Sequence, residues 1–454
     1  MAQGPRSVRT AIGSFLSLER NVLVMSLTAL LINFGFYTFQ PFIPLYLRTL
    51  NANITDIGIV FVAIQVAATV AAIPGGLLAD RLGRKSVIVM GNAVGFGLYL
   101  ALVGVNYWPV ALLILFAATI FSTLVQPAAS STVAESVRMH DRSSAFGTFL
   151  LFTDLGLALG AALGGYFSFT LSILLLGIAG IAAAFIRLGL LKETLPKELR
   201  SERPSSRKPL FIVNLTRNVW LYLLVLVIFN FSVGLGQPIY AIFSTDILNL
   251  SKVQLGVMVS LGYVAAILSS FMAGRLAKKA GVANMMGMGV IVSSLILVPW
   301  LYSPNAFVAI ALFALSGFFA QFFFVANQAL IANITRAEER GSIIGLVTTA
   351  AGAGSIVGPY VGSVLWVLLD PRSPFLISAL LGIAVATPLI WIREPRAARH
   401  CPHCGREVEE QARFCDLCGK LIRYKKCYGC GRDLEESARF CDICGRDQPK
   451  ETKT

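Results

Sequence analysis

Long uncharged apolar stretches recur along almost the whole chain and constrain its fold more than any other feature. Between residues 21 and 393, apolar runs of roughly 18–25 residues alternate with short polar breaks, and a helix of that length crosses a bilayer. Hydrophobic residues make up 56% of the chain and charged residues 14%, far from the balance of soluble domains. We therefore predict an all-α membrane protein with twelve spanning helices, at residues 22–47, 55–79, 86–105, 109–133, 145–166, 169–190, 218–243, 252–276, 283–302, 304–333, 342–368 and 374–392.

The net charge of +14 reflects how the chain is expected to cross the membrane. If the N-terminus is cytoplasmic and successive spans alternate in direction, every Lys and Arg before Pro395 is cytoplasmic except Arg48, Lys252 and Arg372. Such an excess of cytoplasmic positive charge is typical of membrane proteins. We predict a multi-pass protein of the cell (plasma) membrane with both termini in the cytoplasm. No cleavable signal peptide and no nucleic-acid partner are expected.

A duplication with an offset of 197 or 198 residues divides the spans into two sets of six. The first-half residues that recur at this offset are Asn33, Gln40, Gly76, Arg142, Gly147, Gly156, Gly160 and Gly164. Two parallel six-helix repeats form bundles that face each other, and a site between them can open alternately to either side. The expected parts are a cytoplasmic segment at 1–20, pseudo-symmetric six-helix bundles at 21–190 and 218–394, a cytoplasmic central loop at 191–217 and a tail domain at 395–454.

A glycine- and arginine-rich loop lies between the second and third expected spans. It reads Gly-Leu-Leu-Ala-Asp-Arg-Leu-Gly-Arg-Lys from Gly76 to Lys85, and a degenerate copy with Lys278 in place of the acid follows at 274–281. Over residues 20–394 the chain resembles the major facilitator superfamily, whose loop motif this segment matches at every fixed position. The resemblance implies the fold of that superfamily and alternating-access transport, and no catalytic residues of an enzyme.

The resemblance also implies a gate at the cytoplasmic side. Its residues would be Gly76, Asp80, Arg81, Gly83, Arg84, Lys85 and Glu135. Asp80 would lie against the positive N-terminus of the eleventh span, near Arg340 to Ser342. Arg84 would pair with Glu135 at the end of the fourth span. The alternative is that the basic loop only sets the topology.

Glycines at four-residue spacing mark the fifth and eleventh expected spans. Both runs resemble a motif of drug antiporters in the superfamily, although its proline is present in the second half as Pro359 and is Ala161 in the first. Small residues at this spacing allow close helix contact, which suits an interface between the halves. Generic packing of helices is the alternative.

The resemblance implies a substrate cavity lined by spans 1, 4, 7 and 10. The candidates there are the polar and aromatic residues Asn33, Tyr37, Gln40, Gln126, Asn230, Gln237, Gln321 and Asn327, each of which has interhelical hydrogen bonding as its alternative role. No Arg or Lys is expected at midmembrane depth, so the cavity suits neutral, lipophilic or weakly polar solutes.

Asp154 is the one carboxylate inside an apolar run before the tail. Burying an unpaired carboxylate in a membrane is costly and favours its protonated form, which makes Asp154 the candidate for proton coupling. A structural acid that faces away from the cavity is the alternative, and the span-4 arginine of many proton-coupled members is absent.

All eight cysteines lie in the last 54 residues, in two CxxC-x10-CxxC sets offset by 26 positions. Four thiolates at this spacing suit a structural zinc ion, and each set resembles a zinc ribbon. We predict two structural zinc ions and a module that contacts a cytoplasmic protein. The ligands would be Cys401, Cys404, Cys415, Cys418, Cys427, Cys430, Cys441 and Cys444.

These features together predict a secondary active transporter in the lipid bilayer that binds a small-molecule substrate. The favoured activity is proton-coupled efflux of a small hydrophobic or drug-like solute. The alternatives are an uptake carrier for a neutral metabolite or sugar, and a membrane-anchored solute sensor that signals through the zinc ribbons.

Overall fold

The computed structural model shows a helical membrane body and a small tail that contains short strands. It describes residues 19–138, 141–195, 217–334 and 340–391, with tail segments at 399–400, 407–408, 417–419, 424–426 and 433–435. The chain divides into two units, Met1–Arg393 and Glu394–Thr454. Each unit is described by itself.

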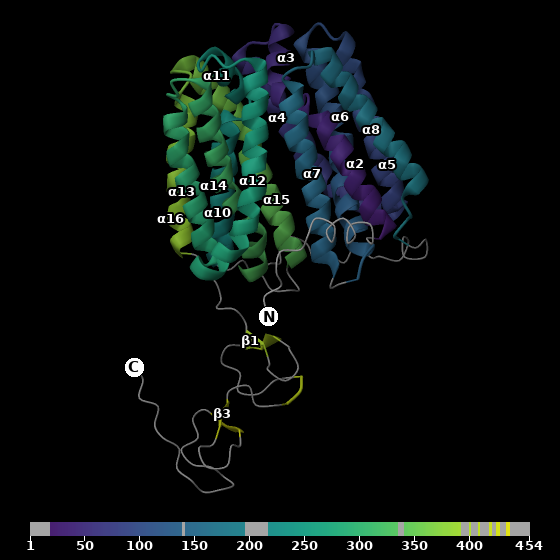
Figure 1. Cartoon of the computed structure of the whole chain (residues 1–454), viewed down its shortest axis with the longest axis vertical. Coiled ribbons are helices and arrows are strands. Elements are labelled where there is room, and N and C mark those ends of the chain that lie inside the picture. The colour runs from purple at the N-terminus through teal and green to yellow at the C-terminus, as the bar shows by residue number, and fades with distance from the viewer. Residues whose placement is uncertain are drawn as a thin grey trace. The chain divides into compact units, whose positions relative to one another are not determined.

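The body consists of two bundles that lie side by side (Figure 1). The first contains α2 (Arg20–Tyr37), η1 (Gln40–Phe42), α3 (Ile43–Thr49), α4 (Ile54–Leu82), α5 (Arg84–Leu100), η2 (Ala101–Gly104), α6 (Trp108–Glu135), α7 (Arg142–Gly164) and α8 (Phe169–Leu190). The second contains α10 (Arg217–Gly236), α11 (Tyr240–Asp246), α12 (Lys252–Ala280), α13 (Val282–Trp300), α14 (Ala306–Ile334), α15 (Arg340–Leu368) and α16 (Ser373–Trp391).

Eleven helical stretches in the described residues are long and apolar enough to cross a membrane. The first of them, Arg20–Thr49, joins α2, η1 and α3. In α16 the described apolar stretch, Ser373–Leu389, is shorter and stands where the twelfth span is expected. The predicted all-α membrane fold is confirmed.

The backbone repeats the same unusual conformations in both bundles. Asn51 and Asn249 adopt φ of 62° and 54°, and Gly83 and Gly281 adopt φ of 95° and 85°. Both pairs are 198 positions apart, and the glycines form the sharp turns that join α4 to α5 and α12 to α13. Capping boxes begin α4 and α12 at equivalent positions, Asn53 with Asp56 and Ser251 with Gln254.

The glycine ladders pack helices together within each bundle. A Cβ atom added at Gly156, Gly160 or Gly164 would lie within 3.0 Å of backbone oxygens of α2, at Leu30, Phe34 and Thr38. The ladder of α15 meets α10 in the same way, at Val227, Phe231 and Leu235. The expectation that the ladders form the interface between the halves is wrong, because another face of α7 is turned to the second bundle.

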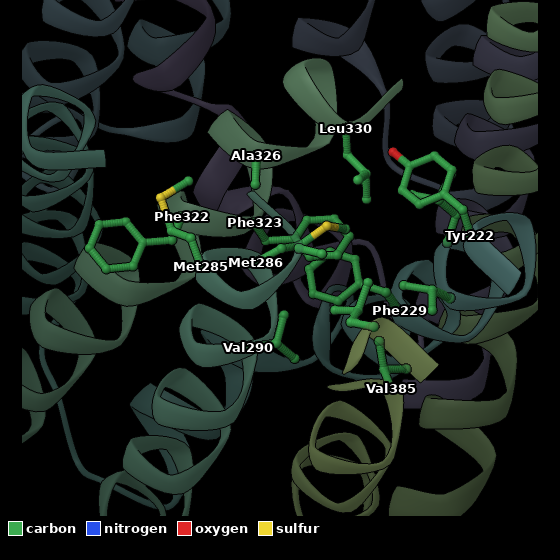
Figure 2. Packing of buried hydrophobic residues seen from close by; sticks show 14 of the residues in the cluster. Tyr222, Phe229, Met285, Met286, Val290, Phe322, Phe323, Ala326, Leu330 and Val385 are labelled. Carbon is green, nitrogen blue, oxygen red and sulfur yellow. The ribbon is translucent and has the colours of Figure 1, made fainter. Parts of the chain in front are cut away.

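Large side chains fill the second bundle between α10, α13, α14 and α16. Figure 2 shows part of this cluster, in which Phe229 of α10 and Phe323 of α14 stack with ring centroids 3.5 Å apart. Met286 of α13 and Val385 of α16 are buried in the same cluster. Side chains from these four helices therefore form one shared core.

Two short antiparallel strand pairs are described in the tail. β1 (Arg399–His400) pairs with β2 (Glu407–Val408), and β3 (Tyr424–Lys426) pairs with β4 (Asp433–Glu435).

Candidate functional site

Arg84 is the centre of the motif loop. Its side chain is 6% exposed, with Nη1 2.8 Å from Asp80 Oδ1 and Nη2 3.2 Å from Glu135 Oε1. The loop therefore brings Arg84 and Glu135 together in the pair expected from the sequence. The other expected partner of Asp80, near Arg340 to Ser342, has side chains outside the described residues.

Glu193 completes this cluster and was not anticipated from the sequence. Its carboxylate accepts hydrogen bonds from the backbone N–H groups of Arg84 (3.0 Å) and Lys85 (3.3 Å), at the N-terminus of α5. The next residue, Thr194, donates to Glu135 Oε2 at 2.7 Å. An anion is favoured at a helix N-terminus, and an acid directly after the sixth span was the available signal. The start of the central loop is thereby tied to the motif.

The two bundles meet at the end of the body that carries Arg48 and Lys252, which we call the outer end. Arg48 Nη1 lies 2.5 Å from Asp246 Oδ2, and Lys252 donates to the Phe167 carbonyl oxygen at 2.5 Å. Asp246 follows Arg48 by 198 positions, so equivalent residues of the two halves form this ion pair. Contacts between the halves thus involve charge pairing as well as apolar packing.

A cavity of about 410 Å³ lies between the bundles, and residues of both halves line it. Four of the predicted substrate residues are in its wall: Tyr37, Gln40, Gln237 and Gln321. The hydroxyl of Tyr263 donates to that of Tyr37 at 3.2 Å, and their rings meet edge to face. Aromatic rings and amide groups together can hold a largely apolar solute and orient it by a few hydrogen bonds.

A second cavity, of about 210 Å³, lies inside the first bundle. Asn33 and Gln126 line it, as do Arg187 and Asn92. This cavity, unlike the one expected between spans 1, 4, 7 and 10, therefore has a cation in its wall. The sequence placed Arg187 among the basic residues near the central loop, whereas its side chain is buried against the cavity.

Asn230 and Asn327 line neither of these cavities. Asn230 Nδ2 donates to the Leu226 carbonyl oxygen at 2.8 Å, and the hydroxyl of Ser355 donates to Asn230 Oδ1. Asn327 Oδ1 accepts a hydrogen bond from the hydroxyl of Tyr222. These amides serve contacts between helices, the alternative role that the sequence allowed.

Asp154 lies on the face of α7 that is turned to the second bundle. Ala161 and Gly165, seven and eleven positions further along α7, share its face and contact α12 at Gly256 and Val253. The carboxylate is half-buried. Within the described residues it forms no hydrogen bond or ion pair. Asp154 thus lies beside the contact that joins the halves.

Seven of the eight tail cysteines lie outside the described residues. Cys418 is described, and Gly419 after it has φ of 67°, as the turn of a Cys-Gly knuckle requires. The first CxxC of each set follows β1 or β3 directly and precedes the partner strand. A CxxC segment between paired strands has the arrangement that zinc ribbons use.

Comparisons with known proteins agree with this geometry. The Major Facilitator Superfamily model matches residues 25–244 and 223–410, and the double zinc ribbon model matches residues 401–445. Quinolone resistance protein NorA of Staphylococcus aureus (strain Mu50 / ATCC 700699) is 21% identical over 83% of this chain and 97% of its own length. Multidrug resistance protein 2 of Bacillus subtilis (strain 168) is 22% identical over 82% and 96%. The crystal structure of nucleoside transporter NupG matches at a TM-score of 0.68 with 16% identity, over 82% of this chain and 98% of that one.

Proposed function

Because the chain belongs to the Major Facilitator Superfamily, we propose that it exports a small hydrophobic or drug-like solute by proton-coupled alternating access. The observation that carries this proposal is the cavity of about 410 Å³ with walls from both duplicated halves. Rocking of one bundle against the other would expose such a cavity to each side in turn.

The direction of transport is proposed from the relatives and from the lining of the cavity. Two relatives that match this chain over most of their length are named for drug resistance. The tyrosines and amides between the bundles suit a large apolar solute with few polar groups. Export of such a solute accounts for both observations.

Proton coupling is proposed to act through Asp154. A carboxylate on the face between the halves changes its charge when a proton binds, and that charge acts on the Tyr37–Tyr263 hydrogen bond. Protonation would therefore alter a contact that joins the bundles. An ionisable group inside the membrane is expensive, and its retention favours a functional role.

Gating is proposed to use ionic contacts at opposite ends of the body. At the outer end, Arg48 and Asp246 connect the bundles directly. At the other end, the Asp80–Arg84–Glu135 cluster holds the loop between α4 and α5 in shape for contact with the second half. We propose that this cluster and both termini lie in the cytoplasm of a plasma-membrane protein, because basic residues beside the cluster favour the cytoplasmic side.

The tail is proposed to hold two structural zinc ions. Each ion would take four cysteine thiolates, from Cys401 to Cys418 in one ribbon and from Cys427 to Cys444 in the other. Such closed sites supply folding energy and leave no open position for chemistry. We propose that the folded ribbons contact a cytoplasmic protein.

A transport assay on the full chain tests the proposed function. Solutes that raise the thermal unfolding midpoint of the purified protein would be loaded into proteoliposomes, with and without a pH gradient. Gradient-dependent movement against the proton flux supports the proposal. Movement without any effect of the gradient contradicts the coupling, movement in the direction of the proton flux favours an uptake carrier, and binding without movement favours a sensor.

A further inference from the structure

The cavity inside the first bundle contains a buried guanidinium group that the transport scheme does not use. Arg187 of α8 is 3% exposed and lines this cavity, and its Nε donates to the Thr28 hydroxyl at 2.8 Å. In the described part of the chain it forms no salt bridge. A buried cation without an anionic partner is costly, and in a membrane span such a group usually serves a functional site.

The Arg187 side chain points into the bundle rather than toward the membrane surface. Asn21 pairs through its side chain with the backbone N–H and carbonyl oxygen of Lys192, so the start of α2 and the end of α8 are level. Arg187 lies five residues inside that level, about 8 Å, whereas Thr28 lies seven residues inside it, about 10 Å. A basic residue that only serves the surface would extend the other way.

Asn92 of α5 adds a second donor to the same cavity. It is 2% exposed, and its Nδ2 atom has no hydrogen-bond partner among the residues that the structure describes. Leaving a buried amide unsatisfied is costly, and a ligand that accepts its hydrogen bonds would remove this cost. Donor groups of α8 and α5 therefore line one cavity.

The other residues that line the cavity indicate the chemistry of the rest of the ligand. Ile32, Phe36 and Phe96 form an apolar wall, and no acidic side chain is among the described residues that line the cavity. Among the acids of this bundle, Glu135 pairs with Arg84, and Asp154 lies on the face of α7 that is turned to the second bundle. The site thus combines a fixed cation and an amide donor with an apolar wall.

From these contacts we infer that the first bundle holds a binding subsite for the carboxylate of an amphiphilic organic acid. The planar guanidinium of Arg187 can donate paired hydrogen bonds to a carboxylate, and the amide of Asn92 can donate another. The cavity of about 210 Å³ takes the acid group and a small ring. The inference rests on the proposed transport function in one respect, namely that this ligand is the transported solute or a part of it. Substrates would then be hydrophobic anions or zwitterions rather than neutral compounds.

A matched pair of compounds tests the subsite by binding alone. 1-Naphthoate carries the carboxylate, and 1-naphthamide has the same ring without the charge. Binding of each to the detergent-purified full chain is measured by competition and by thermal shift. We expect naphthoate to bind at least about tenfold more tightly than naphthamide. Equal affinities, or no binding of naphthoate at millimolar concentration, would overturn the inference.

Three variants separate binding from structure. Arg187→Gln should remove the preference for the anion, and Arg187→Lys should retain part of it. Asn92→Asp leaves Arg187 in place but supplies an internal carboxylate, and it should also remove the preference. In each variant, an unchanged affinity for naphthamide shows that the site is still folded. A preference that survives both Arg187→Gln and Asn92→Asp would show that Arg187 serves only helix packing.

Transport of the same two compounds in proteoliposomes separates this inference from the proposed function. If naphthoate binds selectively but neither compound moves, the subsite stands and transport of its ligand fails. If only naphthamide moves, transport stands and the subsite is contradicted.

Discussion

Arg84 shows how much one residue of the motif loop organises. Its guanidinium bridges Asp80 of α4 and Glu135 of α6, and its backbone N–H is held by Glu193 at the start of the central loop. Three segments of the chain therefore meet at a single buried cation. Because both partner carboxylates keep about a third of their area exposed, the pairs are partly screened and their strength lies in their number.

Replacement of Arg84 tests this arrangement. Arg84→Met should lower the free energy of unfolding by about 1–2 kcal/mol, since Asp80 and Glu135 lose their shared partner. Arg81→Met is the matched control, because Arg81 is exposed in the last turn of α4, three residues before Arg84, and it should change stability by less than about 0.5 kcal/mol. Thermal unfolding of the purified protein measures both. Equal losses of stability in the two variants would show that the loop contributes only its positive charge and not the ion pairs of Arg84.

Within each bundle, glycines let the helices pack closely. These glycines lie on one face of the helix, so a separate face can contact the other half. On α7 the ladder of Gly156, Gly160 and Gly164 meets α2, while Ala161 and Gly165 meet α12. Two adjacent faces of one helix thus do different work. The first makes a bundle rigid, and the second lets two rigid bundles slide or rock.

A pair of glycines on α7 distinguishes close packing from open space. Gly160→Ala should destabilise the protein by about 1–3 kcal/mol, because the new methyl group meets the backbone of α2 at Phe34. Gly147→Ala meets nothing within 4 Å and should be neutral or stabilising by up to about 1 kcal/mol. Unfolding midpoints of the two variants give the comparison. A stable Gly160→Ala protein would contradict the packing of α7 on α2.

The ribbons of the tail make a prediction about metal. Purified full chain should contain about two zinc ions, and Cys404→Ser, which breaks one complete ligand set, should reduce this to about one. Chelation should expose the tail thiols to a maleimide without changing the unfolding midpoint of the membrane body. Thiols that react equally fast before chelation would count against both sites.

Elements could be predicted from the sequence more readily than the contacts between them. Apolar run length places the spans, and the recurring offset divides them into halves, because both depend on local composition. The pair of Arg84 with Glu135 was implied by the resemblance of the loop to the motif of the superfamily. Three contacts could not be predicted from the sequence: the helices that the glycine ladders meet, the role of Glu193 and the inward direction of Arg187. Helix rotation and side-chain direction depend on tertiary packing that spacing does not specify.

At the scale of the whole molecule, the outer end connects the halves through Arg48 and Asp246. These side chains are 44% and 38% exposed, so the pair contributes less than about 1 kcal/mol, enough to bias two states of similar free energy. The body before the tail contains no cysteine, so one introduced residue reports access to the cavity. Gln237 lines the cavity and is a suitable position for it.

Charge reversal tests whether this pair closes the outer end. In a Gln237→Cys background, Arg48→Glu should raise labelling by an impermeant maleimide added to whole cells by about two- to fivefold. Combining Arg48→Asp with Asp246→Arg should restore slow labelling. Unchanged labelling in the single reversal would show that the pair does not influence access.

We propose that a proton on Asp154 drives alternation of two duplicated bundles, and this can be measured as transport by Asp154→Asn in proteoliposomes. The amide cannot release a proton, so a pH gradient should no longer accelerate transport, whereas exchange of solute across the membrane without a gradient should continue. Asp56→Asn is the control, since Asp56 belongs to the capping box at the start of α4, and it should keep the response to the gradient. Full gradient-driven transport by Asp154→Asn would contradict the account.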